Sequence, residues 1–177
     1  MINYITGDAT SPVSSVSSGH KLIIHCCNDE GRWGAGFVLA LTKKWPWVER
    51  SYREWYNNSA NGGMPSPDER VKIFSDDPFE SFHLGAIQVV DVAEDISVVN
   101  MIGQDGCGKD KYDHPPVRYY AIEEALKKIR KVAYSRLSSI HCPRFGAGLA
   151  GGNWDIIHYM LDIYLEDQNV TVYDFKA

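Results

Sequence analysis

The sequence has no apolar run that approaches the roughly 20 residues needed to cross a membrane. Its opening residues read MINYITGD, which lacks both the basic start and the apolar core of a secretory signal. We therefore expect no membrane span and no export, and we predict a cytoplasmic location.

Positive charge is also scarce. The 177 residues carry 18 lysines and arginines against 23 aspartates and glutamates, which gives a formal net charge of −5. A surface with this balance repels polyphosphates and anionic membranes, so we expect no sequence recognition of nucleic acid and no membrane partner. An apolar content of 44% is ordinary for a globular protein, and the length predicts a single domain over residues 1–177.

Cysteine pairs with the spacing of metal ligands are missing. The four cysteines form no CxxC pair, and no histidine lies at the spacing of a zinc finger. The sequence therefore predicts no metal site, and we expect no cofactor. Cys26 and Cys142 lie in apolar, strand-like runs, which favours buried thiols.

Glycine, in contrast, is concentrated in two loops of the same design. Residues 140–155 read IHCPRFGAGLAGGNWD, an order that indicates a short strand, a glycine-rich loop and the start of a helix. Residues 22–41 repeat this order as LIIHCCNDEGRWGAGFVLAL. Bare glycines let the backbone approach a ligand closely, and N–H groups near a helix N-terminus attract anions. One such loop can be a simple turn, but two of them predict the two sides of one phosphate-binding site.

Alternating strand and helix patterns predict the fold class. Two β-branched runs, 86–93 and 96–102, indicate a hairpin, and the sheet is therefore expected to be mixed. We predict a three-layer α/β/α fold whose central sheet has about six strands. The polar segment 57–77 is expected to be an exposed excursion, and Asn153 is expected to cap the last helix. Four cations of the helix after Pro116 are expected to face solvent: Lys127, Lys128, Arg130 and Lys131.

Together these motifs resemble the macrodomain family, whose members bind ADP-ribose. The matches run in order along nearly the whole chain, and the pattern looks most similar to the branch with the yeast ADP-ribose-1″-phosphate phosphatase and the human terminal ADP-ribose protein glycohydrolase. The resemblance implies a macrodomain fold, with ADP-ribose or ADP-ribosylated molecules as partners. The matching motifs are Ile5-Thr6-Gly7-Asp8, Ile24-His25-Cys26-Cys27-Asn28, Gly31-Arg32-Trp33-Gly34-Ala35-Gly36, the run from Pro143 to Trp154, and Thr171-Val172-Tyr173.

The resemblance also implies roles for particular residues. Asp8, with Ala9 beside it, would accept the adenine amino group, although an aspartate here is also typical of a turn. Asn28 would hold the distal ribose, with a turn residue as the alternative. Tyr173 would stack near adenine, with buried packing as the alternative. The two loops would cradle the diphosphate through Gly34, Ala35, Gly36, Phe145, Gly146, Ala147 and Gly148.

Catalytic residues are harder to assign. Relatives that cleave glutamate-linked ADP-ribose use a lysine and an aspartate at positions that hold Gln104 and Ala150 here. The aspartate that another branch places early in the helix after the first loop is also missing. His25 aligns with a histidine proposed to act in the phosphatase-like relative, and Asp29 can reach the distal ribose, so these two are the candidate catalytic residues. A hydrogen-bonded strand histidine is the alternative for His25.

We therefore predict a protein that binds free or protein-linked ADP-ribose, with hydrolysis of ADP-ribose-1″-phosphate or of an ADP-ribosyl adduct as its candidate activity. The alternative is a reader that binds ADP-ribose without turnover. The missing lysine and aspartate favour the reader, whereas His25 and Asp29 favour the enzyme. A third reading, an NAD or flavin protein, is disfavoured because no GxGxxG follows the first strand.

Overall fold

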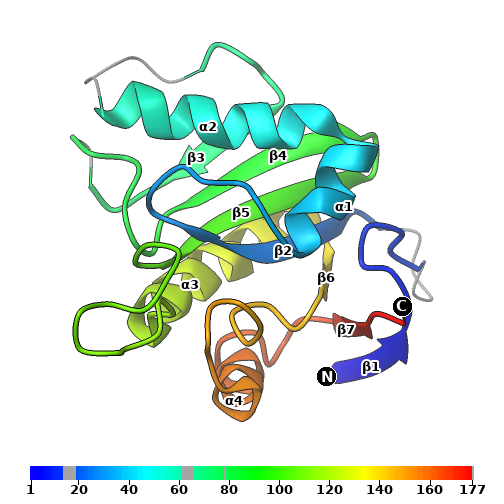
Figure 1. Ribbon diagram of the computed structural model, residues 1–177. Helices are drawn as coiled ribbons and strands as arrows, with labels where there is room; N and C mark the ends of the chain where they lie inside the picture. The colour runs from blue at the N-terminus through cyan, green and yellow to red at the C-terminus, as the bar shows by residue number, and fades with distance from the viewer. Residues whose placement is uncertain (14–18, 61–65, 78, 177) are drawn as a thin grey trace.

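The computed structural model describes residues 1–13, 19–60, 66–77 and 79–176, which form a mixed sheet covered by helices on both faces (Figure 1). The seven strands lie in the order β1-β7-β6-β2-β5-β4-β3. In chain order the elements are β1 Ile2–Thr6, β2 Lys21–Asn28, α1 Phe37–Lys44, α2 Pro46–Ala60, β3 Val71–Phe74, β4 Ile87–Ala93, β5 Ile96–Gln104, α3 Tyr119–Arg136, β6 Ser139–Cys142, α4 Trp154–Tyr164 and β7 Val170–Asp174.

The five strands β1, β7, β6, β2 and β5 are neighbours in this order and run parallel, whereas β4 pairs antiparallel with β5, and β3 pairs antiparallel with β4. The predicted hairpin is confirmed, since β4 and β5 are consecutive antiparallel neighbours. The strand beyond the expected six is β3, which lies within the segment 57–77 where the sequence predicts an exposed excursion. That prediction is wrong for β3, whose four residues alternate between half-buried and exposed and are too few for a clear periodic signal. Residues 14–18 and 61–65 lie outside the described part of the chain.

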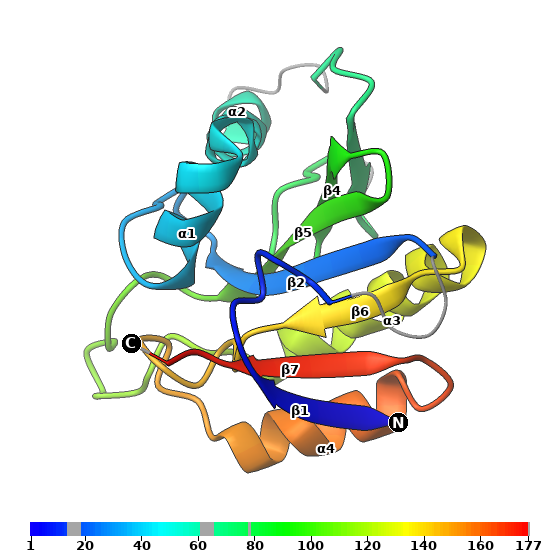
Figure 2. The ribbon, with the colours of Figure 1, turned by 90° about the vertical axis from the view of Figure 1, so that its right-hand side faces the viewer.

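Helices α1 and α2 cover one face of the sheet, and α3 and α4 cover the other (Figure 2). Strand β2 lies between these two layers and is buried along nearly its whole length. Leu22 and Ile24 pack with the core under α3 and α4, while Ile23 and Cys27 pack under α1 and α2. This explains the uninterrupted apolar pattern of β2, because successive side chains point to opposite faces and both faces are covered.

Helix ends follow the local sequence. Helix α1 ends at Lys44 and α2 begins at Pro46, since Trp45 precedes a proline and leaves the helical conformation. Asn153 caps α4 as predicted, with its side chain accepting a hydrogen bond from the Asp155 N–H at 2.9 Å. No helix among the described residues is long and apolar enough to cross a membrane.

One expected surface cation is not on the surface. Lys128 of α3 is 9% exposed, and its Nζ lies 2.6 Å from Asp76 Oδ2. The solvated face predicted for the four cations of this helix is therefore wrong at Lys128. Its partner Asp76 lies in the segment just after β3, which the helix pattern alone could not place beside α3.

The topology places a crevice between β2 and β6. These strands are parallel neighbours, so their carboxyl ends meet at the same edge of the sheet. Strand β2 leads into α1 on one face, whereas β6 leads into α4 on the other (Figure 2). Ligands in open α/β sheets bind where neighbouring strands lead to opposite faces, so the fold directs attention to the loops after β2 and β6.

Candidate functional site

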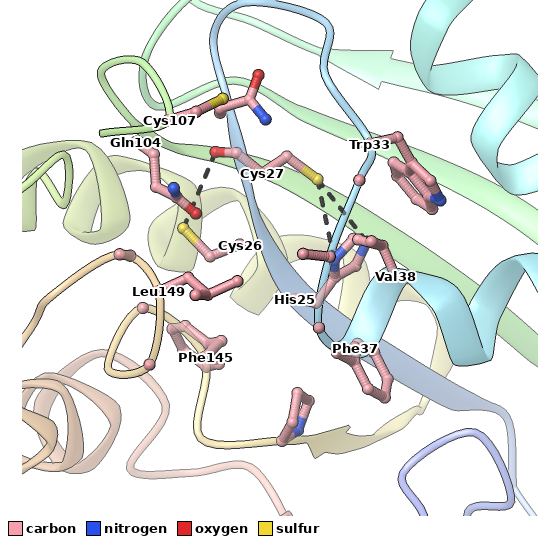
Figure 3. Close-up of a pocket in the computed structure, with 18 of the residues that line it drawn as sticks. His25, Cys26, Cys27, Trp33, Phe37, Val38, Gln104, Cys107, Phe145 and Leu149 are labelled. Atoms are coloured by element: carbon pink, nitrogen blue, oxygen red, sulfur yellow. Dashed lines mark hydrogen bonds between the residues drawn. The ribbon is translucent and has the colours of Figure 1, made fainter.

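The two glycine-rich loops meet in one cavity of about 470 Å³, which we call the loop cavity (Figure 3). One wall comes from Asn28, the last residue of β2, and residues 32–38, and the opposite wall from residues 143–146 and 148–150, after β6. Leu149 reaches across from the second loop: its Cδ1 lies 3.8 Å from the position that a Cβ on Gly36 would take. Residues of both glycine-rich loops thus line one cavity.

The loops offer unpaired backbone donors to this cavity. Gly34 and Gly148 both line it, and a Cβ at either position would meet no atom within 4 Å. Both glycines therefore leave space that a ligand can fill. Six N–H groups make no hydrogen bond with any described residue: those of Gly34, Ala35, Gly36, Gly146, Ala147 and Gly148. All of these residues except Ala147 line the cavity.

The N-terminus of α1 adds a further attraction for anions. Gly36, with φ 77°, is the residue before this helix, and no side chain caps the helix or places an acid in its first turn. Phe37 and Val38 of the first turn line the loop cavity. Helix α4 differs, because Asn153 and Asp155 already satisfy its N-terminus. Of the two helices that follow the loops, α1 is therefore the one with its positive end open to a ligand.

Among the described residues of the lining, arginines carry the formal charge. Arg32 and Arg144 line the loop cavity, and no aspartate or glutamate is among its described lining residues. Arg144 is held in place by Asp174, whose two oxygens lie 2.6 and 3.0 Å from its Nε and Nη2. Its guanidinium also lies 5.1 Å from the Tyr4 ring centroid and 5.6 Å from the Trp154 ring. In a protein of net charge −5, this lining favours an anionic ligand.

Asn28 shapes the first loop. Its Oδ1 accepts hydrogen bonds from the Glu30 and Arg32 N–H groups at 2.9 and 3.1 Å, and its Nδ2 donates to the Arg32 carbonyl at 2.7 Å. The Tyr52 hydroxyl donates to the backbone carbonyl oxygen of Asn28 at 2.6 Å. Asn28 lines the loop cavity, but its amide holds the turn that carries Gly31 and Arg32.

His25 lies at the inner wall, among the rings of Trp33 and Phe37 (Figure 3). Asn100 Nδ2 donates to Gln88, so Asn100 Oδ1 accepts from His25 Nε2 at 2.5 Å. Nδ1 lies 3.9 Å from Cys27 Sγ. Burial lowers the pKa of His25 to about 4, and its imidazole is neutral at neutral pH. This arrangement matches the alternative that the sequence left open, a hydrogen-bonded strand histidine.

Asp29 is hydrogen-bonded to the end of β5 and to the loop after it. Its Oδ1 accepts a hydrogen bond from the Gly106 N–H at 2.8 Å, and its own N–H donates to the Gln104 carbonyl at 2.9 Å. Asp29 does not line the loop cavity, whereas Gln104, the last residue of β5, and Cys107 of the loop after it do. The structure therefore brings Asn28 and the two glycine loops together but does not pair His25 with Asp29.

The residues expected at the adenine end lie outside the lining of this cavity. Asp8 Oδ1 accepts hydrogen bonds from the Thr10 N–H and hydroxyl, both at 2.8 Å, as in a turn. Ala9 is buried, and Tyr173 is 3% exposed, with its hydroxyl 2.7 Å from His141 Nδ1. For Tyr173 this is the buried packing that the sequence left as the alternative.

Several lining residues escaped the sequence reasoning. Arg32 and Arg144 flank the motif glycines and are exposed. Their positive charge next to glycine-rich loops, in an acidic chain, was the signal that could have marked them as site residues. Leu149 also lines the cavity and is 74% exposed, and nothing in the sequence pattern marks it. Cys26, expected to be buried, is half-buried and reaches the cavity, although burial raises its pKa to about 12.

No protein-family model matches the chain. A protein of unknown function from Bacteroides thetaiotaomicron is 41% identical, with a TM-score of 0.84 and 98% of each chain covered. A macrodomain protein from Streptomyces coelicolor is 39% identical, with a TM-score of 0.74 over 98% of this chain and 99% of that one.

Curated sequences give shorter or weaker matches. The ADP-ribose 1″-phosphate phosphatase of Meyerozyma guilliermondii is 35% identical over 82 residues, which are 45% of either chain. The chromodomain-helicase-DNA-binding protein 1-like of Mus musculus is 26% identical over 97% of this chain. The chain spans only 17% of that much longer relative.

Proposed function

The chain belongs to the macrodomain family, and from this premise we propose that the loop cavity binds ADP-ribose, either free or attached to a protein. The carrying observation is a cavity whose two facing loops leave backbone N–H groups unpaired beside an uncapped helix N-terminus. A diphosphate has several acceptor oxygens and a double negative charge, which suits this set of donors.

The rest of the lining suits the sugars. Phe145 lines the cavity beside Gly146 and packs edge-on against Trp154, with ring centroids 5.8 Å apart. Arg144 stands at the same rim with its guanidinium already fixed by Asp174. At the other end, Asn28 and the Arg32 turn border the space for the distal ribose. The cavity volume of about 470 Å³ is within the range of small-molecule sites.

The test is calorimetric titration with ADP-ribose, AMP and NAD. We expect ADP-ribose to bind roughly tenfold or more tightly than AMP, because AMP lacks the second phosphate and the distal ribose. NAD carries the same diphosphate but a nicotinamide at the distal end, so it reports on the space near Asn28. Equal binding of AMP and ADP-ribose would contradict a diphosphate site formed by two loops.

A second candidate function is hydrolysis at the distal ribose, and the resemblance to a protein named ADP-ribose 1″-phosphate phosphatase favours it. In that reaction the oxygen of water bonds to phosphorus while the bond from phosphorus to the 1″ oxygen breaks. One proton leaves the water and one reaches the ribose oxygen. The engaged nitrogen of His25 and the anchoring of Asp29 to Gly106 favour binding over this turnover.

Product analysis separates the two candidates. Incubating the protein with ADP-ribose-1″-phosphate and measuring inorganic phosphate gives release well above the uncatalysed rate for an enzyme, and none for a reader. The same samples used for calorimetry serve here, so a protein that binds ADP-ribose and releases no phosphate is a reader of this substrate.

A further inference from the structure

A second cavity, of about 430 Å³, opens at the same edge of the sheet as the loop cavity. We call it the α2 cavity, because the last turns of α2 form one of its walls. The segment before β4 and the first turn of α3 form the others. Figure 1 shows the carboxyl end of α2 and the loop after β5 on the same side of the sheet as the loop after β2. Three aromatic side chains line it, from Tyr56, Phe82 and Tyr120.

The linings of the two cavities meet at consecutive residues of the chain. Asn28 lines the loop cavity, and the next residue, Asp29, lines the α2 cavity. Gly31 of the same turn packs directly against the Tyr56 ring, which would collide with a Cβ there. The Gly106 N–H, in the loop after β5, donates a hydrogen bond to Asp29 and holds this residue in place.

The charge of the α2 cavity is opposite to that of the loop cavity. Asp29 and Glu80 line it, and no lysine or arginine does among the described residues. Asp29 Oδ2 and the Glu80 carboxylate have no hydrogen-bond or ion-pair partner in the described part of the chain. Both ring nitrogens of His83 are engaged, Nδ1 with the Leu84 carbonyl and Nε2 with Ser75. The unpaired polar atoms of the described lining therefore include carboxylate oxygens beside aromatic rings, together with the Tyr56 and Tyr120 hydroxyls.

We propose that the α2 cavity holds a lysine or arginine side chain of the protein to which ADP-ribose is attached. Aromatic faces with nearby carboxylates bind an ammonium or guanidinium group through cation–π attraction and charge-assisted hydrogen bonds. The proposal rests on the proposed function, because it requires ADP-ribose in the loop cavity with its distal ribose toward Asn28. The attached chain then leaves past Asn28 and Asp29, into the α2 cavity.

This geometry sets where the basic residue stands in the target. An extended peptide spans about 3.4 Å per residue, so we place the basic residue within roughly three positions of the modified one, which lets its side chain pass Asn28 and Asp29. The protein would then discriminate among ADP-ribosylated targets by their neighbouring charge: basic neighbours favour binding, and acidic neighbours meet Asp29 and Glu80 and are repelled.

The experiment uses peptides that carry ADP-ribose on a glutamine side-chain amide, a stable linkage. In one peptide set lysine occupies each of the three positions on either side, and in matched sets alanine or glutamate replaces it. We expect the best lysine peptide to bind about fivefold more tightly than its glutamate counterpart, with the difference shrinking at high salt.

Protein variants locate the preference. Glu80 and Tyr120 are exposed, so Glu80→Gln and Tyr120→Ala are expected to fold, and both are expected to remove most of the lysine preference. Their affinity for free ADP-ribose should stay at the wild-type value. The matched control is Glu94→Gln, which removes an exposed carboxylate at the β4–β5 turn, outside both cavities, and should keep the preference.

Two failures are distinguishable. If free ADP-ribose binds but all peptides bind alike, or if the preference survives both α2-cavity variants, the assignment of this cavity is wrong while the proposed function stands. If neither free ADP-ribose nor any peptide binds, the proposed function itself fails and this inference fails with it.

Discussion

Polar residues at the end of β2 form hydrogen bonds that stabilise the fold. Asn28 uses both ends of its amide to hold the turn that follows it, and Asp29 fastens that turn to the loop after β5. His25 takes part in a buried chain of hydrogen bonds that continues through Asn100 and Gln88 to the Ser51 carbonyl. The candidate binding and catalytic residues of this strand end therefore also stabilise the fold.

The role of His25 can be tested by substitution. His25→Phe leaves Asn100 Oδ1 without a donor, and we expect the free energy of unfolding to fall by about 1–3 kcal/mol. His25→Gln can still donate to Asn100 and should lose less. Denaturant unfolding measures both variants, and ADP-ribose titration of the folded proteins should give near wild-type affinity.

The same variants address catalysis. If wild-type protein releases phosphate and folded His25→Gln does not, at unchanged stability and unchanged ADP-ribose affinity, His25 acts on the substrate. If activity follows the folded fraction in both variants, its role is to hold Asn100.

At the scale of elements, the two loops and helix α1 form the anion-binding side of the protein. Gly34→Val fills space that lies open in the loop cavity. Because a Cβ there meets no neighbour, we expect little loss of stability but at least about a tenfold loss of ADP-ribose affinity, since the side chain occupies the ligand's volume. Calorimetry measures the affinity, and thermal unfolding measures the stability.

Gly108 supplies the matched control for that substitution. It also has open space at its Cβ position, but it does not line the loop cavity. Gly108→Val should therefore leave both stability and affinity unchanged. An equal loss of affinity in the two variants would point to a general effect on the loops rather than to a ligand beside Gly34.

Helix α1 offers a prediction in which stability and binding change in opposite directions. Leu39 is exposed in the first turn, where no acid is present. Leu39→Glu complements the helix dipole and should raise the free energy of unfolding by about 0.3–1 kcal/mol, while its charge competes with an anionic ligand and weakens binding. Leu39→Gln is the neutral control. If Leu39→Glu binds ADP-ribose as well as Leu39→Gln does, the helix N-terminus does not face the diphosphate.

The sequence predicted the two loops, the hairpin and the three layers because each depends on local or periodic patterns. The glycines of the loops, the β-branched runs of β4 and β5 and the continuous apolar run of β2 are all local signals. Strand β3 was missed because its four residues gain their partner from β4. The direction of Asp29 and the burial of Lys128 depend on Gly106 and Asp76, which are distant in sequence, and no local pattern reveals such contacts.

At the scale of the whole molecule, an acidic protein carries two adjoining cavities of opposite character. Arginines and unpaired N–H groups face the loop cavity, whereas carboxylates and tyrosines face the α2 cavity. A ligand that is anionic at one end and attached to a basic peptide at the other complements both. The sequence reveals the loop cavity through its motifs, but the α2 cavity is assembled from α2, the segment before β4, and α3, and no motif marks it.

Stability as a function of pH is a property of the whole fold and follows from two buried histidines. Burial lowers the pKa of His25 and of His141 to about 4 from an ordinary 6.5. The unfolded chain therefore binds these protons more readily than the folded protein does between those values. The free energy of unfolding should be fully retained above pH 6.5 and should fall toward pH 4, by up to about 3 kcal/mol for each histidine.

Denaturant unfolding between pH 7 and pH 4.5 measures this slope. Carboxyl groups whose pKa is lowered by ion pairs, such as Asp76 beside Lys128 and Asp174 beside Arg144, lose their contribution only as the pH falls below their ordinary 3.8. The two effects therefore occupy different pH ranges. His25→Gln and His141→Gln should each flatten the slope. A flat wild-type profile down to pH 4.5 would mean that acid reaches these histidines in the folded protein, and that the core around β2 and β6 is more open to water than its packing implies.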